Sequence, residues 1–353
     1  MTGATKRILV VSDGNLPGAT QKISFGQPFS DAVRSRGVSV QYALHVKSKT
    51  EIAPTFERER PDLLVLSRCT AQSGVNWVRK ARSKKIPVIY HIDDDLLEVP
   101  RSLGEEKYLA YSAPERKQAL RDNINACDLL YVSTPALAER FKEHGVEVPI
   151  VAGDIYCSVA IKDIGALLPP ATGPVIGYMG TGGHGDDLNM ILPAIKSALT
   201  AIPDLQFEVF GTIPMPEELE AFGNRVRHLP PVADYNDFIP FLRSLGWWVG
   251  LAPLEDNQFN RCKADTKWVE YTMSGMAVVA SDLPVYHRAC ADGCGLLASS
   301  VASWEESIMR LLLDPQARSA TMQAAQDKLR LQYNHAALQQ QVLAVFAKVG
   351  LKL

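Results

Sequence analysis

The sequence predicts an α/β protein with two Rossmann-like domains, each built on a parallel sheet, that face one another across a cleft. Short apolar runs typical of buried parallel strands alternate with helical segments along nearly the whole chain. The 353 residues exceed what one ordinary core supports and suit two domains of about 150 to 180 residues each. A stretch rich in Pro and Gly, LLPPATGP at 167–174, separates the two halves.

The first half contains six predicted strands. The loop after the first of them, residues 13–26, has three glycines and one proline but no GxGxxG, which argues against a dinucleotide site. A second loop, residues 99–112, is expected to overhang the cleft. The strands are predicted at 7–12, 38–44, 62–67, 87–92, 128–133 and 149–152. The helices are predicted at 27–36, 75–83, 114–127 and 136–144.

Three consecutive carboxylates, Asp93, Asp94 and Asp95, follow the apolar run PVIYHI at 87–92. At the carboxyl end of a strand they would project into the cleft, where crowding should raise the pKa of at least one of them. Such a carboxylate could act as general base on an acceptor hydroxyl. Binding of Mg²⁺ or Mn²⁺ is an alternative, and so is helix capping with solvation.

The second half repeats the alternation. Its first strand is followed by GTGGHGDDL at 180–188, where Gly180, Gly182 and Gly183 would let backbone amides approach an anion near a helix start. His184 could donate to a phosphate oxygen or simply face water. No Lys-Ser/Thr pair follows, so the turn is not a P-loop. The strands are predicted at 174–179, 205–210, 226–229, 247–253, 276–280 and 295–298. The helices are predicted at 234–245, 302–313, 315–331 and 334–348.

The stretch 249–286 reads as strand, polar loop, helix and strand. Its loop lies where parallel sheets bind ligands, outside the carboxyl ends of the strands. The helix is expected to run from the loop to about residue 274, so Lys263, Lys267 and Glu270 would share one face at i, i+4 and i+7. Two ammonium groups and a deeper carboxylate suit a diphosphate followed by a ribose hydroxyl. A solvated charged face is the alternative.

Within this stretch, EYTMSGMAVVAS at 270–281 resembles the donor-binding segment of GT-B glycosyltransferases, especially retaining enzymes of glycosyltransferase family 4. DLLYVSTPALAERFKEHG at 128–145 resembles another segment of these enzymes, and YHIDDDL resembles a DDD-containing bacterial subgroup. Cys262 stands where the family often has a second Glu that touches the donor sugar, and Ala277 replaces the usual Pro. The stereochemistry of transfer, retaining or inverting, therefore stays open.

The resemblance implies a hexosyltransferase-type enzyme with the GT-B fold. It would move a sugar from a nucleotide-diphosphate sugar to a saccharide or lipid-linked acceptor, in cell-surface polysaccharide or glycoconjugate synthesis, without a metal or a cofactor. Residues 1–168 would form the acceptor-side domain and 169–333 the nucleotide-sugar domain. The helix within 334–353 would pack back toward the first domain.

The resemblance also implies roles for single residues. Lys263, Lys267 and Arg261 would hold the diphosphate, and Glu270 would accept ribose hydroxyls. His91 could contact the transferred sugar. The expected donor-binding residues are Gly180, Gly182, Gly183, His184, Glu255, Asp256, Asn257, Asn260, Arg261, Lys263, Lys267 and Glu270. The expected catalytic residues are His91, Asp93, Asp94 and Asp95, and the expected acceptor-binding residues are Asp13 and Asn15.

Two other functions stay open, a sugar-nucleotide epimerase of the same architecture and a non-catalytic two-lobed ligand-binding protein. The formal net charge of −2 gives no sign of a nucleic-acid partner. We expect a cytoplasmic protein, because no signal peptide opens the chain, no apolar run approaches the ~20 residues of a membrane helix, and the six cysteines lack paired spacing. Peripheral contact with the inner face of a membrane stays open, although no basic amphipathic helix supports it.

Overall fold

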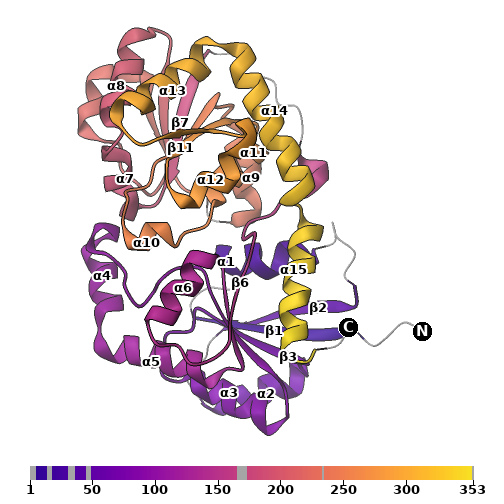
Figure 1. Cartoon of the computed structure of the whole chain (residues 1–353). Coiled ribbons are helices and arrows are strands. Elements are labelled where there is room, and N and C mark those ends of the chain that lie inside the picture. The colour runs from indigo at the N-terminus through magenta and orange to yellow at the C-terminus, as the bar shows by residue number, and fades with distance from the viewer. Residues whose placement is uncertain are drawn as a thin grey trace.

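The computed structural model describes residues 5–13, 18–30, 36–44, 49–164, 173–232 and 234–351. In these ranges the chain forms two separate six-stranded sheets, one in each half, and the paired strands are parallel. Helices surround both sheets, and the two halves are stacked one above the other in Figure 1. The predicted class, two Rossmann-like α/β domains, is confirmed.

The first sheet has the strand order β2-β1-β3-β4-β5-β6. Strands β3, β4 and β5 are buried along their whole length, which explains why their sequences are continuous apolar runs. The strands are β1 (Lys6–Ser12), β2 (Val38–Leu44), β3 (Leu63–Ser67), β4 (Val88–Ile92), β5 (Leu129–Val132) and β6 (Ile150–Ala152). The helices are α1 (Ala19–Gln21), η1 (Lys22–Gly26), η2 (Gln27–Phe29), α2 (Lys49–Glu59), α3 (Gly74–Ser83), η3 (Arg101–Leu103), α4 (Glu105–Ser112), α5 (Pro114–Ala126), α6 (Pro135–Glu143) and η4 (Ile161–Asp163).

The second sheet has the strand order β12-β11-β10-β7-β8-β9. The strands are β7 (Val175–Gly180), β8 (Gln206–Gly211), β9 (Val226–Leu229), β10 (Val249–Ala252), β11 (Ala277–Ser281) and β12 (Leu296–Ala298). The helices are η5 (Gly182–His184), α7 (Gly185–Asn189), α8 (Leu192–Ala201), η6 (Glu217–Arg225), α9 (Tyr235–Ser244), α10 (Gln258–Arg261), α11 (Thr266–Met273), α12 (Pro284–Cys290), η7 (Ala291–Gly293), α13 (Val301–Leu313), α14 (Pro315–Gln332) and α15 (His335–Lys348). All the predicted strands are present, with ends that differ by at most two residues.

The last helix returns to the first domain. Helix α14 runs beside the second domain, and α15 continues down along the first one (Figure 1). On α15, Gln341 Nε2 donates to Tyr131 Oη at 2.7 Å, and the Phe346 ring stacks on Phe29 with centroids 6.2 Å apart. The chain thus crosses between the domains twice, and the first crossing includes residues 165–172, which lie outside the described ranges. The domain bounds 1–168, 169–333 and 334–353 stay a prediction.

Three predictions for the first half are wrong. Residues 19–26, expected in a loop, are helical, and η1 within them is a π-helix, a conformation frequent at functional sites. The helix expected at 27–36 ends early, because Ser30 is extended at φ −70° and ψ 166°. Residues 31–35 lie outside the described ranges. The expected loop at 99–112 contains the helix α4.

The helix expected to reach residue 274 is also broken, between α10 and α11. The carbonyl of Cys262 accepts a hydrogen bond from Thr134 Oγ1 of the first domain at 2.8 Å, and Lys263 N donates back to Asn260 O at 3.1 Å. Phe259 and Cys262 are buried in the apolar cluster of the first domain. Contacts with the other domain therefore replace the regular helix, and the prediction that Lys263 shares one helix face with Lys267 and Glu270 is wrong.

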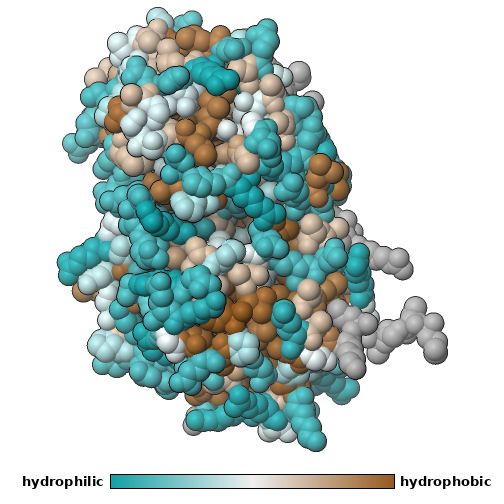
Figure 2. All heavy atoms as spheres, viewed as in Figure 1, coloured by the Kyte–Doolittle hydropathy of each residue, from teal (hydrophilic) through white to brown (hydrophobic). Residues whose placement is uncertain are grey.

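On the face shown in Figure 2, hydrophilic side chains cover most of both domains, and a hydrophobic patch lies over the first domain. Among the described helices, none combines the length and the apolar character needed to cross a membrane. Peripheral contact with a membrane stays a prediction.

Candidate functional site

The glycine-rich turn follows β7 and leads through η5 into α7. Gly180 O accepts a hydrogen bond from Thr212 N at 3.1 Å, and Gly182 N donates to Thr212 Oγ1 at 3.1 Å. At Gly183, a Cβ atom would lie 2.6 Å from the carbonyl oxygen of Leu103 in the first domain. The missing side chain therefore permits a close backbone contact between the domains. Anion binding by these three glycines stays a prediction.

Asp187 joins this turn to the loop after β10. Its Oδ2 lies 2.7 Å from His184 Nδ1, and its Oδ1 accepts from Glu255 N at 2.7 Å. Burial lowers the pKa of His184 to about 4, and the nearby Lys267 acts in the same direction. Because the carboxylate accepts, we assign the imidazole proton to Nδ1, which leaves Nε2 as an acceptor. The predicted donation from His184 to a phosphate would need a second proton on the ring.

The loop after β10 is held by its own side chains. Asn257 caps α10 by accepting from Asn260 N at 2.9 Å, and Asn260 Nδ2 donates to Glu255 O at 3.0 Å. On the surface, Arg261 and Asp256 form a bidentate ion pair of 2.5 and 2.8 Å. The five residues thus lie together as predicted for a binding loop, but Arg261 already has an anionic partner. Their contacts with a donor stay predictions.

Lys267 and Glu270 lie one turn apart on α11. Lys267 is half-buried and has no hydrogen bond or ion pair with any described residue, and its Nζ lies 5.6 Å from the centroid of the Tyr178 ring. Burial lowers the pKa of Lys267 to about 8. Glu270 is 6% exposed and accepts from Tyr235 Oη at 3.0 Å, and burial raises its pKa to about 7. An unpartnered, partly desolvated ammonium beside a carboxyl group suits an anionic ligand that also carries hydroxyls.

Lys263 lies between α10 and α11 and reaches the first domain. Its Nζ is 3.3 Å from Asp94 Oδ1, and Arg68 Nη1 lies 3.3 Å from Asp94 Oδ2. Burial alone would raise the pKa of Asp94, but the Lys263 ammonium and the Arg68 guanidinium lower it well below its usual range. Lys107 of α4 adds a further positive charge near Asp94. Positive charge from both domains therefore gathers around this carboxylate.

Asp93 is fully engaged on its own side of the boundary. Its Oδ2 accepts from Thr20 Oγ1 at 2.9 Å and from Tyr156 Oη at 2.7 Å, and its Oδ1 pairs with Arg68. Thr20 belongs to α1, directly before the π-helix, so Asp93 holds that helical segment at the carboxyl edge of the first sheet.

Asp95 is buried in the first domain, with 1% of its surface exposed. Its Oδ2 lies 2.9 Å from His144 Nε2 and 3.1 Å from Arg140 Nε, so it secures the end of α6. Burial would raise the pKa of Asp95, but His144 and Arg140 lower it. The expected rise of pKa through crowding is contradicted for Asp94 and Asp95, because each carboxylate has its own cationic partners.

The three carboxylates do not converge on one point. Arg68 pairs with both Asp93 and Asp94, whereas Asp95 pairs with Arg140 and His144. The described part of the chain contains no cluster of His, Cys, Asp or Glu arranged to hold a metal. The metal alternative for the triplet therefore has no geometric support.

His91 is 1% exposed within β4. Its Nδ1 lies 3.1 Å from Ser67 Oγ, its ring meets the Phe25 ring edge-on with centroids 4.9 Å apart, and burial lowers its pKa to about 4. A sugar could reach this ring only if the segment that carries Phe25 moved, so the predicted contact stays a prediction.

Of the two expected acceptor residues, Asp13 lies directly after β1. Its Oδ2 accepts from Thr70 N at 2.7 Å and from Thr70 Oγ1 at 3.1 Å, which ties the loops after β1 and β3 together. Asn15 lies outside the described residues. Acceptor binding by either residue stays a prediction.

Solved structures of similar shape identify the fold. Anabaena HepE in complex with UDP superimposes with a TM-score of 0.67 over 97% of this chain and 100% of its own, at 15% identity. A glycosyltransferase from Rickettsia africae gives 0.66 over 98% of each chain, at 10% identity. The chain has the GT-B fold. A Listeria monocytogenes protein described as a UDP-N-acetylglucosamine 2-epimerase gives 0.55 over 97% of this chain and 96% of its own, at 12% identity.

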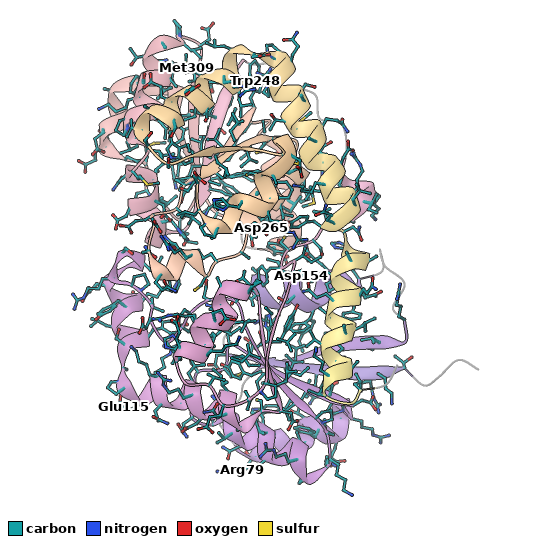
Figure 3. The ribbon with its side chains drawn as sticks, in the orientation of Figure 1. Arg79, Glu115, Asp154, Trp248, Asp265 and Met309 are labelled. Carbon is teal, nitrogen blue, oxygen red and sulfur yellow. The ribbon has the colours of Figure 1, made fainter. Side chains whose placement is uncertain are left out.

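At identities this low, the structural likeness shows the fold alone. No protein-family model matches the sequence, and no curated protein matches it. In this GT-B chain, one predicted donor residue of the second domain, Lys263, pairs with Asp94 of the acidic triplet in the first. Figure 3 labels Asp265 and Asp154 near the boundary between the two domains.

Sequence reasoning missed several residues of the site. Arg68 follows the apolar run LLVLS directly and has a left-handed φ of 55°, which is strained for a residue with a side chain. Its place after a buried strand is the same signal that singled out the triplet. Tyr235 carried no comparable signal, because only the folded chain brings it to Glu270.

Proposed function

We propose that the protein is a glycosyltransferase that takes its sugar from a nucleotide-diphosphate donor. One observation carries the proposal: the Lys267 ammonium, one helical turn from Glu270, forms no hydrogen bond or ion pair with a described residue. Burying an ammonium without a partner costs free energy, and an anion bound beside it would offset that cost. A diphosphate at Lys267 with its ribose at Glu270 fits both groups.

In this proposal the second domain binds the donor. Lys267 and Lys263 face the diphosphate, where negative charge develops as the glycosidic bond breaks. Tyr235 orients Glu270 toward the ribose hydroxyls. Glu255 and the neighbouring Asp256 and Asn257 lie on the loop that would meet the sugar.

The first domain binds the acceptor. Asp94 is the member of the triplet that faces the second domain, and its lowered pKa makes it a weak base while Lys263 pairs with it. If Lys263 turns to the diphosphate, Asp94 loses one cation and its pKa rises, which favours proton transfer from an acceptor hydroxyl. The catalytic step would thus depend on the donor already being bound.

The donor we propose is a UDP-hexose, since HepE has been solved with UDP and with UDP-glucose. The acceptor we propose is a saccharide or lipid-linked saccharide, and the setting a cytoplasmic enzyme of polysaccharide or glycoconjugate synthesis. The motifs at 270–281 and 92–96 support membership of glycosyltransferase family 4. We propose that the reaction needs no metal and no cofactor, because Lys263 and Lys267 could stabilise the charge that develops on the diphosphate.

Nucleotide binding tests the proposal directly. UDP should raise the melting temperature of the wild type, and Lys267→Ala should weaken UDP binding by roughly tenfold, about 1.4 kcal/mol. Lys196→Ala, which removes an exposed lysine of α8, is the matched control and should bind UDP normally. Equal UDP affinity in Lys267→Ala and wild type, or no stabilisation by any nucleoside diphosphate or sugar nucleotide, would overturn the assignment.

A sugar-nucleotide epimerase is the second candidate. Its support is the likeness to the Listeria protein, together with the pKa of about 7 of Glu270, which would suit proton transfer at a sugar carbon. Incubating the protein with UDP-N-acetylglucosamine and no acceptor separates the two functions. Isomerised donor would favour the epimerase, and transfer that requires an acceptor would favour the transferase. Binding of a free sugar without any nucleotide affinity would instead favour the two-lobed binding protein.

A further inference from the structure

A cavity of about 670 Å³ lies between the two domains, where the chain crosses from one to the other, and is called the hinge cavity below. The second domain lines it with α9, and the first lines it with the helical segment 22–30 and with Tyr42. The crossing segment 158–163 and His335, the first residue of α15, complete it. None of the predicted donor, catalytic or acceptor residues lines this cavity. Its volume is typical of small-molecule sites.

The lining of this hinge cavity is positively charged. Lys22, Lys162 and Arg243 are its cationic residues, and Asp163 is its acidic one. Arg243 Nη2 donates to the carbonyl oxygens of Asp163 and Met273, so the guanidinium has no carboxylate partner among the described residues. Lys162 is exposed and forms no ion pair with a described residue. Lys22 is paired with Asp234 at 2.7 Å. Two positive charges thus remain for an anion.

Three polar atoms of the lining are buried and have no hydrogen-bond partner among the described residues, namely Tyr42 Oη, Gln27 Oε1 and Arg243 Nε. Buried polar atoms in native proteins are normally satisfied, so these three atoms in the cavity wall would gain a partner if a ligand displaced the groups that now cover them. Burial raises the pKa of Tyr42 to about 12, so its hydroxyl keeps its proton and can donate. Ile239 and Pro240 of α9 offer apolar surface to a sugar ring.

The cavity is connected to both sides of the proposed active site. Tyr235 lines it and also donates to Glu270, the proposed ribose carboxylate. The segment that begins at Lys22 continues from α1, where Thr20 donates to Asp93. A molecule in the cavity would therefore touch the elements that position Glu270 and Asp93, and it would bridge the two domains.

We propose that the hinge cavity is a second binding site, distinct from the donor site, for a small phosphorylated sugar. The phosphate would meet Arg243 and Lys162, and ring hydroxyls would meet Tyr42 and Gln27. A ligand in the hinge cavity would change the affinity for the nucleotide through Tyr235 and Glu270. This coupling rests on the proposed function, whereas the binding site itself does not. By linkage, UDP changes the affinity of the hinge ligand by the same factor.

Calorimetric titration with glucose 6-phosphate and with inorganic phosphate, each with and without saturating UDP, tests the site. We expect glucose 6-phosphate to bind in the presence of UDP, and more tightly than inorganic phosphate. Lys162→Ala and Tyr42→Phe should each weaken its binding by roughly fivefold. Lys196→Ala, the exposed-lysine control, and Lys267→Ala, a donor-site variant, should both bind it as the wild type does.

Two results would overturn the second site. One is displacement of glucose 6-phosphate by UDP, or its loss in Lys267→Ala, which would place it in the donor site. The other is no binding at millimolar concentration while UDP still binds. Binding of glucose 6-phosphate that depends on Lys162 in a protein that binds no nucleotide would support the hinge site and overturn the proposed function instead. The two proposals therefore fail separately.

Discussion

Lys263 Nζ of the second domain lies 3.3 Å from Asp94 Oδ1 of the first, so one ion pair joins the predicted donor and catalytic residues. Both side chains are less than one-fifth exposed, so bulk water screens the pair only weakly. A diphosphate at Lys263 would compete with Asp94 for the same ammonium. Donor binding should therefore weaken the Lys263–Asp94 ion pair and so change the pKa of Asp94.

Asp94→Asn should strengthen UDP binding and slow sugar transfer. Replacing the carboxylate frees Lys263 and removes a negative charge near the diphosphate. We expect UDP affinity to rise roughly threefold, or about 0.7 kcal/mol. Titration calorimetry measures the affinity, and a transfer assay measures kcat. Asp204→Asn, which alters an exposed carboxylate between α8 and β8, is the control. Weaker UDP binding in Asp94→Asn would contradict the competition.

Glu270 should make stability depend on pH. Its pKa in the folded protein is about 7, above the ordinary value, so the native state holds a proton that the unfolded chain has lost. This contribution, up to about 3 kcal/mol, is present below the unfolded pKa and is lost as pH rises through about 7. Urea unfolding from about pH 5 to about pH 7.5 should therefore show a smaller loss of stability in Glu270→Gln than in wild type. The exposed-residue control, Glu255→Gln, should follow the wild type; equal pH dependence in all three proteins would refute the assignment.

Asp95→Ala should destabilise the first domain without a direct effect on chemistry. The substitution leaves Arg140 and His144 without their buried partner, at a cost of about 3 kcal/mol. Urea unfolding should show this loss, and kcat measured on the remaining folded protein should stay near the wild-type value. Asp186→Asn, at an exposed position of α7, is the control. A large fall in kcat with unchanged stability would instead support the predicted catalytic role of Asp95.

Gly183→Ala should disturb the contact between the domains. The new Cβ would lie 2.6 Å from the Leu103 carbonyl oxygen, so backbone must shift, at a cost of about 1 to 3 kcal/mol. Gly182→Ala is the matched control, because its Cβ would meet Thr212 O at an ordinary 3.6 Å. Thermal unfolding and hydrogen exchange at 101–103 measure the effect. The same response in both variants would argue against the close approach at Gly183.

The predicted strands were largely correct because buried parallel strands need continuous apolar runs, which are visible in the sequence. The run PVIYHI thus located β4 (Val88–Ile92) to within one residue. The break in the predicted helix at Lys263 could not be foreseen from the sequence. It accompanies a hydrogen bond to Cys262 O from Thr134, which lies 128 residues earlier in the chain. Cys262, the departure from the family pattern, proves to be 1% exposed and packed with the first domain.

The acidic triplet illustrates a second limit. Its place at the end of β4 was evident from the chain, but adjacency in sequence suggested one shared environment. In the fold, Asp93 contacts Thr20 and Tyr156, Asp94 contacts Lys263, and Asp95 contacts the end of α6. Only Arg68, among the partners described above, is shared, by Asp93 and Asp94. The pKa of a carboxyl group depends on its nearest charges, and these come from distant parts of the chain.

The sequence by itself determined the α/β class, the two halves and the segments that reach the boundary between them, because periodicity and turn residues are local properties of the chain. Tertiary structure alone decided which side chains meet there. It gave Lys267 no ion pair within the described ranges, paired Lys263 with Asp94, buried His91 and placed Tyr235 against Glu270. Those outcomes depend on how two separate sheets face each other, and no local pattern encodes the distance between them.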